Sequence, residues 1–274
     1  MKKVIIAFDG THFSKSAFEF AKQLNKLEPI LLAGVFLPQI EIANLWSYAA
    51  ASTGAPFIPL IEEGEAEAIE KNIKNFENLC IKNDIEHRIH KDFFDLTLPE
   101  LKKETRFADL LILSSQKFYE NLGENTSYSY LQDALQDTEC PVVLVPEEFT
   151  FPKNIILAYD GTESSVFAIK QFAYLFPQLC NKRAILVYVH KNTDKDFPDK
   201  IQIEELAARH FTNLELLKLN INPKKYFTTW ITAQKAPILI SGSYGRSGLS
   251  ELFKKSFIKE IIGEHNLPIF IAHK

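Results

Sequence analysis

The sequence of 274 residues lacks several features that mark large classes of proteins. Its net charge of -4 leaves no basic field to attract a polyanion, which argues against nucleic acid or anionic lipid as a partner. No run of eighteen apolar residues is present, so we expect no membrane-spanning helix. The first apolar run is interrupted by Asp9 before a signal peptide's apolar region could form. We therefore expect a cytoplasmic protein.

Cysteine is also scarce. The three cysteines, Cys80, Cys140 and Cys180, are odd in number and widely spaced, and no two of them form a CxxC pair. This pattern fits neither a disulfide framework nor a zinc ribbon. We expect reduced, mostly buried thiols, in agreement with a reducing compartment.

The length lies near the size at which one hydrophobic core splits into two, so two domains are the starting expectation. An internal repeat supports it. Residues 4–17 read VIIAFDGTHFSKSA and residues 155–168 read IILAYDGTESSVFA. Each copy is a short apolar run that leads through Asp-Gly-Thr into a helical pattern.

The two halves also end alike. ADLLILSSQK at 108–117 with CPVVLV at 140–145 matches APILISGSYG at 236–245 with LPIFIA at 267–272. A polar segment between two prolines, 146–152, separates the copies and is typical of a connection. We predict one domain over 1–148 and a second over 149–274.

Within each half, β-type runs alternate with helical patterns. Such alternation predicts an α/β fold: two similar doubly wound units, each a five-stranded parallel sheet with helices on both faces. The expected strands are 4–8, 30–36, 86–91, 109–114, 141–145, 154–159, 183–189, 213–219, 237–241 and 268–272. The expected helices are 12–25, 63–83, 96–105, 127–137, 163–176, 199–211, 223–234 and 255–264.

The strongest chemical signal follows the fourth strand of the second half. The run from Ser241 to Ser250, SGSYGRSGLS, places Gly242 and Gly245 where backbone N–H groups can converge on phosphate oxygens. The N-terminus of the next helix adds partial positive charge, and Arg246 and Ser256 offer side-chain donors. The loop is neither a Walker A sequence nor a GxGxxG fingerprint.

These features resemble the universal stress protein family, and a tandem member in particular. The resemblance rests on Asp-Gly-Thr after the first strand of each half and on Gly242-x-x-Gly245 with Ser256 before the closing strand. It covers essentially the whole chain. It implies the adenine nucleotide alpha hydrolase-like fold, ATP or a related adenine nucleotide as ligand, and Mg²⁺ as its companion. It also implies that the last strands, 141–145 and 268–272, pair to form an internal pseudo-dimer. Whether two such chains associate further as a homo-oligomer is left open.

The resemblance assigns residues of the second half to the nucleotide. Asp160 would lie by the adenine and ribose, and the backbone at Val189 would read the adenine edge. Lys255 stands where ATP-binding members have glycine, so its ammonium either meets the phosphates or obstructs their approach. The complete predicted nucleotide site is Ala158, Asp160, Gly161, Thr162, Val189, Ser241, Gly242, Gly245, Arg246, Lys255, Ser256 and Phe257.

The first half departs further from the family pattern. Ser114-Ser115-Gln116-Lys117 replaces G-x-x-G, although Asp9 and Val35 keep their places. Without both glycines the close backbone cradle is lost. We predict that this half binds no ATP in the family manner.

Other patterns have plainer explanations. His87 and His90 lie on an expected strand without convergent ligands, which disfavours a zinc site. Ser164 and Ser165 lie outside any G-x-S-x-G, so no catalytic triad is assigned, and Asp160 could simply brace a helix start. The apolar segment 38–59 is either a lid or interface patch, or a short helix packed on its own domain.

Three functions remain open from the sequence. The first is a cytoplasmic stress-response regulatory protein that holds an adenine nucleotide in its second half, without turnover. The second is an ATP hydrolase or phosphotransferase that uses Lys255, Arg246 and Mg²⁺, for which the sequence offers no placed general base. The third is an interaction module of the same fold that binds no nucleotide.

Overall fold

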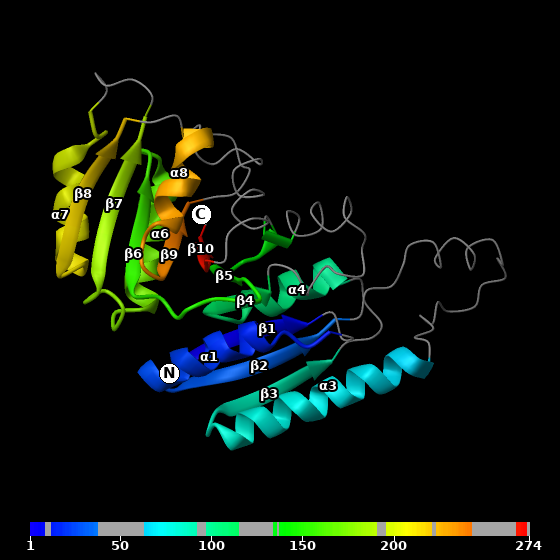
Figure 1. Ribbon diagram of the computed structural model, residues 1–274. Helices are drawn as coiled ribbons and strands as arrows, with labels where there is room; N and C mark the ends of the chain where they lie inside the picture. Colours follow the sequence, from blue (N-terminus) through cyan, green and yellow to red (C-terminus); the bar gives the residue numbers. More distant parts are fainter. Residues whose placement is uncertain are drawn as a thin grey trace, which may run out of the picture.

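A computed structural model describes residues 1–8, 12–37, 63–91, 97–114, 134–135, 137–190, 196–220, 223–242 and 267–272. In this part of the chain, ten strands form one continuous, twisted sheet with helices packed on both its faces (Figure 1). The first half of the chain forms one end of the sheet and the second half forms the other. The two meet at strands β5 and β10.

The first half alternates strands and helices as the sequence pattern predicts. Its elements are β1 (Lys2–Phe8), α1 (Lys15–Leu27), β2 (Ile30–Phe36), α3 (Glu63–Lys82), β3 (Glu86–Lys91), α4 (Thr97–Arg106), β4 (Leu110–Ser114) and β5 (Val142–Val145).

The second half repeats this order. Its elements are β6 (Asn154–Tyr159), α6 (Glu163–Leu175), β7 (Arg183–Val189), α7 (Lys200–His210), β8 (Asn213–Leu219), α8 (Pro223–Thr232), β9 (Pro237–Ser241) and β10 (Ile269–Ile271).

The strand order is β3-β2-β1-β4-β5-β10-β9-β6-β7-β8. Read inward from either edge, the two halves have the same order, because β8, β7, β6, β9 and β10 take the places of β3, β2, β1, β4 and β5. All pairs within a half are parallel, and β5 pairs antiparallel with β10. The predicted fold class and the predicted pairing of the two last strands are confirmed.

The junction strands have apolar side chains throughout. Val142, Val143 and Leu144 of β5 pair with Ile271, Phe270 and Ile269 of β10, and each of the six is at most 1% exposed. Each of these strands also has a parallel neighbour on its other side, β4 and β9. Pairing satisfies the backbone groups of both strand edges, which would otherwise be open to other chains.

Alternation along the strands builds two cores, one on each face of the sheet. On one face, side chains from α1, α3, α6 and α7 cover strand residues such as Val4, Phe8 and Tyr159. On the other face, α4 and α8 cover strand residues such as Ile5 and Ala158. Each core runs across both halves. The molecule is therefore doubly wound, and the sheet separates two continuous apolar layers.

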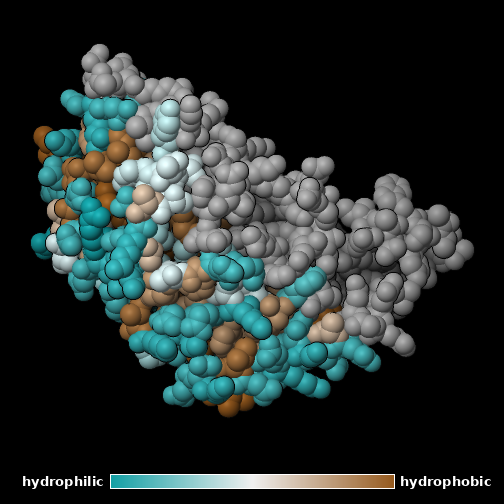
Figure 2. All heavy atoms as spheres, in the orientation of Figure 1, coloured by the Kyte–Doolittle hydropathy of each residue, from teal (hydrophilic) through white to brown (hydrophobic). Residues whose placement is uncertain are grey.

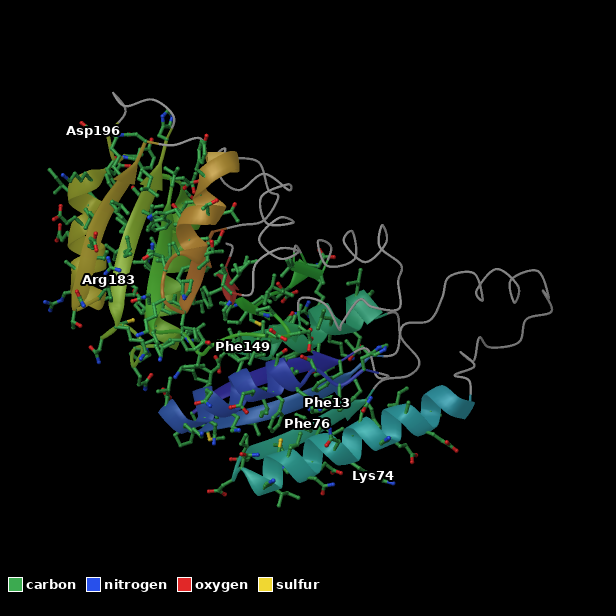
Figure 3. All side chains as sticks on the ribbon, in the orientation of Figure 1. Phe13, Lys74, Phe76, Phe149, Arg183 and Asp196 are labelled. Carbon is green, nitrogen blue, oxygen red and sulfur yellow. The ribbon has the colours of Figure 1, made fainter. Side chains whose placement is uncertain are left out.

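The connection between the halves is anchored by aromatic rings. Phe149 and Phe151, which lie between β5 and β6, pack against Phe20 of α1 at ring-centroid distances of 5.8 and 5.4 Å. Figure 3 shows Phe149 where the two halves meet. The Gln178 amide, which follows α6, donates to Glu28, which follows α1, at 2.9 Å. These ring contacts tie the connection to the first half. The predicted boundary between residues 148 and 149 stays a prediction.

The helix expected at 12–25 begins and ends later than predicted. α1 starts at Lys15, with Ser14 as its N-cap, and runs to Leu27. The Ser14 hydroxyl accepts from the N–H of Ala17 at 3.1 Å, and this cap sets the helix start. The other described helices match their predicted ranges within two residues at each end. The expected helix 255–264, most of 127–137 and the segment 38–59 lie outside the described residues.

A paired exchange of side-chain size distinguishes the two copies. In the first half the ring of Phe76, on α3, lies over Gly34 of β2, where an added Cβ would come within 2.9 Å of ring carbons. The strand registers place Leu186 at the position of Gly34, and the sequence offset between β3 and β8 places Ile203 of α7 at the position of Phe76. A glycine under a large ring is thus replaced by two aliphatic side chains.

The described surface is mostly hydrophilic. In Figure 2 hydrophilic side chains dominate the described surface, while hydrophobic atoms gather over the part of the sheet that contains β7 and β8. Within the described ranges, no helix has the length and apolarity needed to cross a bilayer.

The three cysteines are free and buried, as predicted. Burial raises the pKa of Cys80 and of Cys140 to about 12, and that of Cys180 to about 11. Thiolate, the reactive form, is therefore scarce at neutral pH, and the sulfur atoms are covered by the cores.

We expect no thiol of the native protein to react rapidly with the disulfide reagent DTNB at pH 8, because a thiol with a pKa of 11 to 12 is protonated there. Unfolding in guanidinium chloride should release three reactive thiols, counted by absorbance. Rapid reaction of even one thiol before unfolding would contradict the assignment.

Candidate functional site

The carboxyl ends of three neighbouring strands form the candidate site of the second half. β6 lies between β7 and β9, and the chain leaves β6 toward β7 on one side while β9 lies on the other. Such a switch point is where ligands bind in open α/β sheets. Asp160 follows β6, Val189 ends β7, and Ser241 ends β9 just before Gly242. These predicted site residues share one edge of the sheet.

Asp160 has one carboxylate oxygen engaged. Its Oδ1 accepts from the backbone N–H of Thr162 at 3.0 Å and from the Thr162 hydroxyl at 2.6 Å. Thr162 is the N-cap of α6, and its Oγ1 accepts from the N–H of Ser165. Asp160 therefore braces the start of α6, the structural role considered from the sequence. No described residue donates to Oδ2, so this oxygen can accept from a ligand.

The turn between β6 and α6 requires glycine. Gly161 has φ of +83°, a backbone conformation that favours residues without a Cβ. An added Cβ would also come within 2.7 Å of Pro198, which precedes α7. The Tyr159 hydroxyl donates to the carbonyl of the same Pro198 at 2.8 Å. The segment before α7 is thus held against the end of β6.

Gly242 has a packing role that needs no ligand. An added Cβ would lie 2.6 Å from the carbonyl carbon of Ser164 and 2.7 Å from the backbone N of Ser165, both in the first turn of α6. Real Cβ atoms do not approach backbone this closely. The first glycine of the G-x-x-G pattern therefore lets the end of β9 touch α6 directly. The contact on α6 is a role for this glycine beside the phosphate binding that the sequence predicts.

The first half has a side chain at the matching place. Val4 of β1 pairs with Leu110, and Ile155 of β6 pairs with Ile238, so Ser114 of β4 corresponds to Gly242. Ser114 is 1% exposed, and its hydroxyl donates to the Glu147 carboxylate at 2.7 Å. Glu147 follows β5, at the same edge of the sheet. In the first half an anionic side chain thus lies at the end of the strand that would carry the phosphate loop.

The difference at this position accompanies the late start of α1. By the repeat, Phe13 and Ser14 correspond to Ser164 and Ser165. The latter pair is helical and lies against Gly242, whereas Phe13 and Ser14 precede the helix. A Cβ on residue 114 excludes the close backbone approach seen in the second half. The copy with Ser114 at this position is the copy whose helix begins a turn later.

Other predicted site residues are distributed as follows. Ala158 is buried on the core face that α8 covers, and Ser241 is buried with its hydroxyl donating to the Gly242 carbonyl at 3.1 Å. Both shape the end of the sheet rather than present free polar groups. Gly245, Arg246, Lys255, Ser256 and Phe257 lie outside the described residues.

The remaining patterns have structural explanations. His90 of β3 contacts Glu104 of α4, with Nδ1 2.8 Å from Oε2. The described residues hold no group of three or more His, Cys, Asp or Glu side chains suited to a metal ion. Ser165 is buried, and its hydroxyl donates to the Thr162 carbonyl at 2.8 Å. That bond commits the Ser165 hydroxyl to the helix cap.

Glu147 belongs to the loop region of the first half, a place that the sequence did not indicate. It had been placed in the polar connection between domains. Only the pairing of β5 beside β4 brings its carboxylate to Ser114. The available signal was the loss of glycine at 114 together with a carboxylate shortly after the next strand.

Replacing Gly242 by alanine should destabilise the fold by about 1 to 3 kcal/mol, because its Cβ must displace the backbone of α6. Urea denaturation without any ligand measures this loss. The matched control is Ser114→Ala, which removes a hydroxyl and its bond to Glu147 and should cost only about 1 kcal/mol. Wild-type stability of Gly242→Ala would refute the packing role.

Comparison with known proteins finds solved structures with a similar fold. No family model matches the sequence, and a search of curated proteins finds no match. Among solved structures, a universal stress protein from Archaeoglobus fulgidus superimposes with a TM-score of 0.73 at 13% identity, covering 100% of this chain and 96% of that chain. A putative universal stress protein from Pseudomonas aeruginosa gives a TM-score of 0.50 at 12% identity, covering 100% and 93%. A functionally unknown protein from the same organism gives 0.51 at 12%, covering 100% and 92%.

These likenesses extend over both halves and the sheet that joins them. At such low identity they speak for the arrangement of strands and helices and not for shared ligands. The chain has the α/β fold seen in universal stress protein structures.

Proposed function

We propose that this chain is a tandem universal stress protein, a cytoplasmic regulatory protein of the stress response that binds ATP or a related adenine nucleotide in its second half. The observation that carries the proposal is the convergence of Asp160, Val189 and Gly242 at the β6 switch point. Asp160 keeps Oδ2 available for a ribose hydroxyl. The fold likeness supports the same placement.

The described residues suit the sugar and base of a nucleotide. A carboxylate that accepts two hydrogen bonds through Oδ1 is held in one orientation, so Oδ2 is preorganised as an acceptor. Val189, 5% exposed, ends β7 next to this position and offers its backbone to a base edge. A bound adenine nucleotide would bring its own phosphates and Mg²⁺, and the Gly245, Arg246 and Ser256 segment of the sequence is proposed to hold them.

The proposal includes a difference between the two halves: only the second half binds the nucleotide. In the first half, Ser114 replaces the packing glycine and Glu147 places a carboxylate beside it. Like charges repel, so this carboxylate disfavours a phosphate at the end of β4. The second half has glycine at that point, and its α6 begins one turn earlier. One nucleotide per chain is the expected stoichiometry.

A second function has its own support. Gly242 is explained by packing on α6, and Asp160 is explained by its brace on Thr162. Both features are therefore compatible with an interaction module that binds no nucleotide. Turnover is not part of either proposal, because no described side chain is placed as a general base for an attacking water.

The substitution Asp160→Asn tests the nucleotide site without breaking the helix brace. The asparagine Oδ1 can still accept from Thr162, while Oδ2 becomes an amide donor and loses its acceptor role. Nucleotide-stripped protein is titrated with ATP and Mg²⁺ while melting temperature and phosphate release are followed. At about 100 times its dissociation constant, ATP should stabilise the wild type by roughly 2.7 kcal/mol.

The matched control is Asp9→Asn, the same change in the first half. We expect Asp160→Asn to abolish most of the ATP-induced stabilisation and Asp9→Asn to leave it intact. Stabilisation without phosphate release supports a binding protein, whereas release would show an enzyme. If ATP, ADP and AMP all fail to stabilise the wild type, the interaction module stands instead.

The loop glycine offers an independent test of the asymmetry. Gly245→Val puts a branched side chain where the backbone must approach phosphates, and Lys117→Val is the equivalent position of the first half. We expect isothermal titration to show loss of ATP binding in the first variant alone. Equal losses in both would show that the halves contribute alike.

A further inference from the structure

A cavity of about 670 Å³ lies between helices α6 and α7, and it adjoins the proposed nucleotide site at Gly161 and Thr162, which line both. Ala158, Val189, Ser241 and Gly242 do not line it. Its walls are two helix faces with the same spacing. α6 presents Glu163, Val166, Phe167 and Lys170, and the start and body of α7 present Asp199, Gln202, Ile203 and Leu206.

The spacing of these residues, i, i+3, i+4 and i+7 on each helix, puts each set on one face. Both helices return from the carboxyl edge of the sheet, so their N-terminal ends lie at the same end of the cavity. Tyr159 and Thr162 close that end. The volume is within the range of small-molecule sites.

Aromatic rings pack against one another beside β1 in the first half. Phe13 stacks on Phe8 with a centroid distance of 5.0 Å, and Phe18 contacts Phe76 edge-on at 6.2 Å. Figure 3 shows Phe13 and Phe76 inside the first half, between β1 and α3. The matching residues of the second half are Ser164 for Phe13 and Ile169 for Phe18. The first half thus has rings at two positions where the second half has Ser164 and Ile169, neither of which lines the cavity.

The charges of the cavity lie at its two ends. Glu163 and Asp199 stand at the N-terminal end of the helices, and Lys170 stands two turns further along α6. None of the three forms an ion pair with a described residue. Lys170 is half-buried, so its aliphatic stem is partly covered by the cavity wall.

The floor between these charges is apolar. Val166, Phe167 and Leu206 are half-buried and Ile203 is 2% exposed. Gln202 lies between the ends and can both donate to and accept from an amide group. A ligand with apolar side groups and an amide backbone would match this middle section.

The spacing of the end charges gives the ligand's length. Glu163 and Lys170 are seven residues apart on one helix, which is about 10 Å along the axis. An extended chain covers about 3.3 to 3.6 Å per residue, so three residues place their free amine and free carboxylate about 10 Å apart. We infer that the α6–α7 cavity binds a short apolar peptide of about three residues, with its amino end at Glu163 and Asp199 and its carboxylate at Lys170.

The test uses the full chain and the peptide Val-Leu-Val with free ends, followed by ¹H–¹⁵N correlation spectra. Binding should shift amide signals of α6 and α7, with an affinity set by the two end charges. Blocking the carboxylate as an amide, or the amine by acetylation, should each weaken binding about fivefold. Val-Leu, too short to reach both ends, should bind as weakly as a blocked peptide.

Two substitutions separate recognition from folding. Lys170→Met should weaken the free peptide about fivefold and leave the amidated peptide unchanged, because both changes remove one interaction. Leu206→Trp should narrow the apolar middle of the cavity and weaken binding while the melting temperature is retained. Lys74→Met, on the outer face of α3, is the matched control and should change nothing (Figure 3).

Three results would overturn the inference. These are equal affinity for free and doubly blocked peptides, peptide-induced shifts outside α6 and α7, and the absence of any shift at millimolar Val-Leu-Val. Saturating ATP with Mg²⁺ in a parallel titration keeps the nucleotide proposal separate, because failure of peptide binding does not affect ATP-induced stabilisation.

Discussion

The antiparallel pairing of β5 with β10 is the interaction on which the molecule depends. Both strands are short, and each becomes an internal strand only because the other lies beside it. The pairing makes one sheet from two halves and lets each core run across the junction. It also fixes orientation. Since strands within a half are parallel and the junction is antiparallel, the carboxyl edges of the two halves face opposite ways, and no ligand can bridge the two switch points.

Separation of the two edges lets each copy change without the other. The decisive position is the end of the fourth strand, where one copy has Gly242 and the other Ser114. Without a Cβ, Gly242 allows the first turn of α6 to contact the end of β9. In the copy with Ser114, α1 begins later, and Phe13, which precedes that helix, stacks on Phe8. The presence or absence of a Cβ at this position thus accompanies differences in helix length and ring packing between the two copies. It also accompanies the difference in the charge at the end of the fourth strand.

The cavity between α6 and α7 is part of the same divergence. The copy with Ser114 packs aromatic rings beside its first strand, and the copy with Gly242 has a cavity between its first two helices. Gly34 under Phe76 and Leu186 with Ile203 show that the strand layer is packed in both copies. The openness of the second half therefore arises at the helix layer. That layer determines which half can accommodate small molecules.

Periodicity and the repeat were enough to predict the strands and the doubly wound class, because the alternation of apolar and polar residues is local to each segment and the two copies align at Asp-Gly-Thr. The turn chemistry at Gly161 follows from the sequence in the same way. The pairing of the last strands was implied by the resemblance to a known family. Three features depended on tertiary contact: the packing of Gly242 on Ser164, the bond from Ser114 to Glu147, and the cavity between α6 and α7 that Lys170 lines. Each joins residues from elements distant in the chain, so a linear pattern reveals the residue types while only the folded sheet brings them within contact distance.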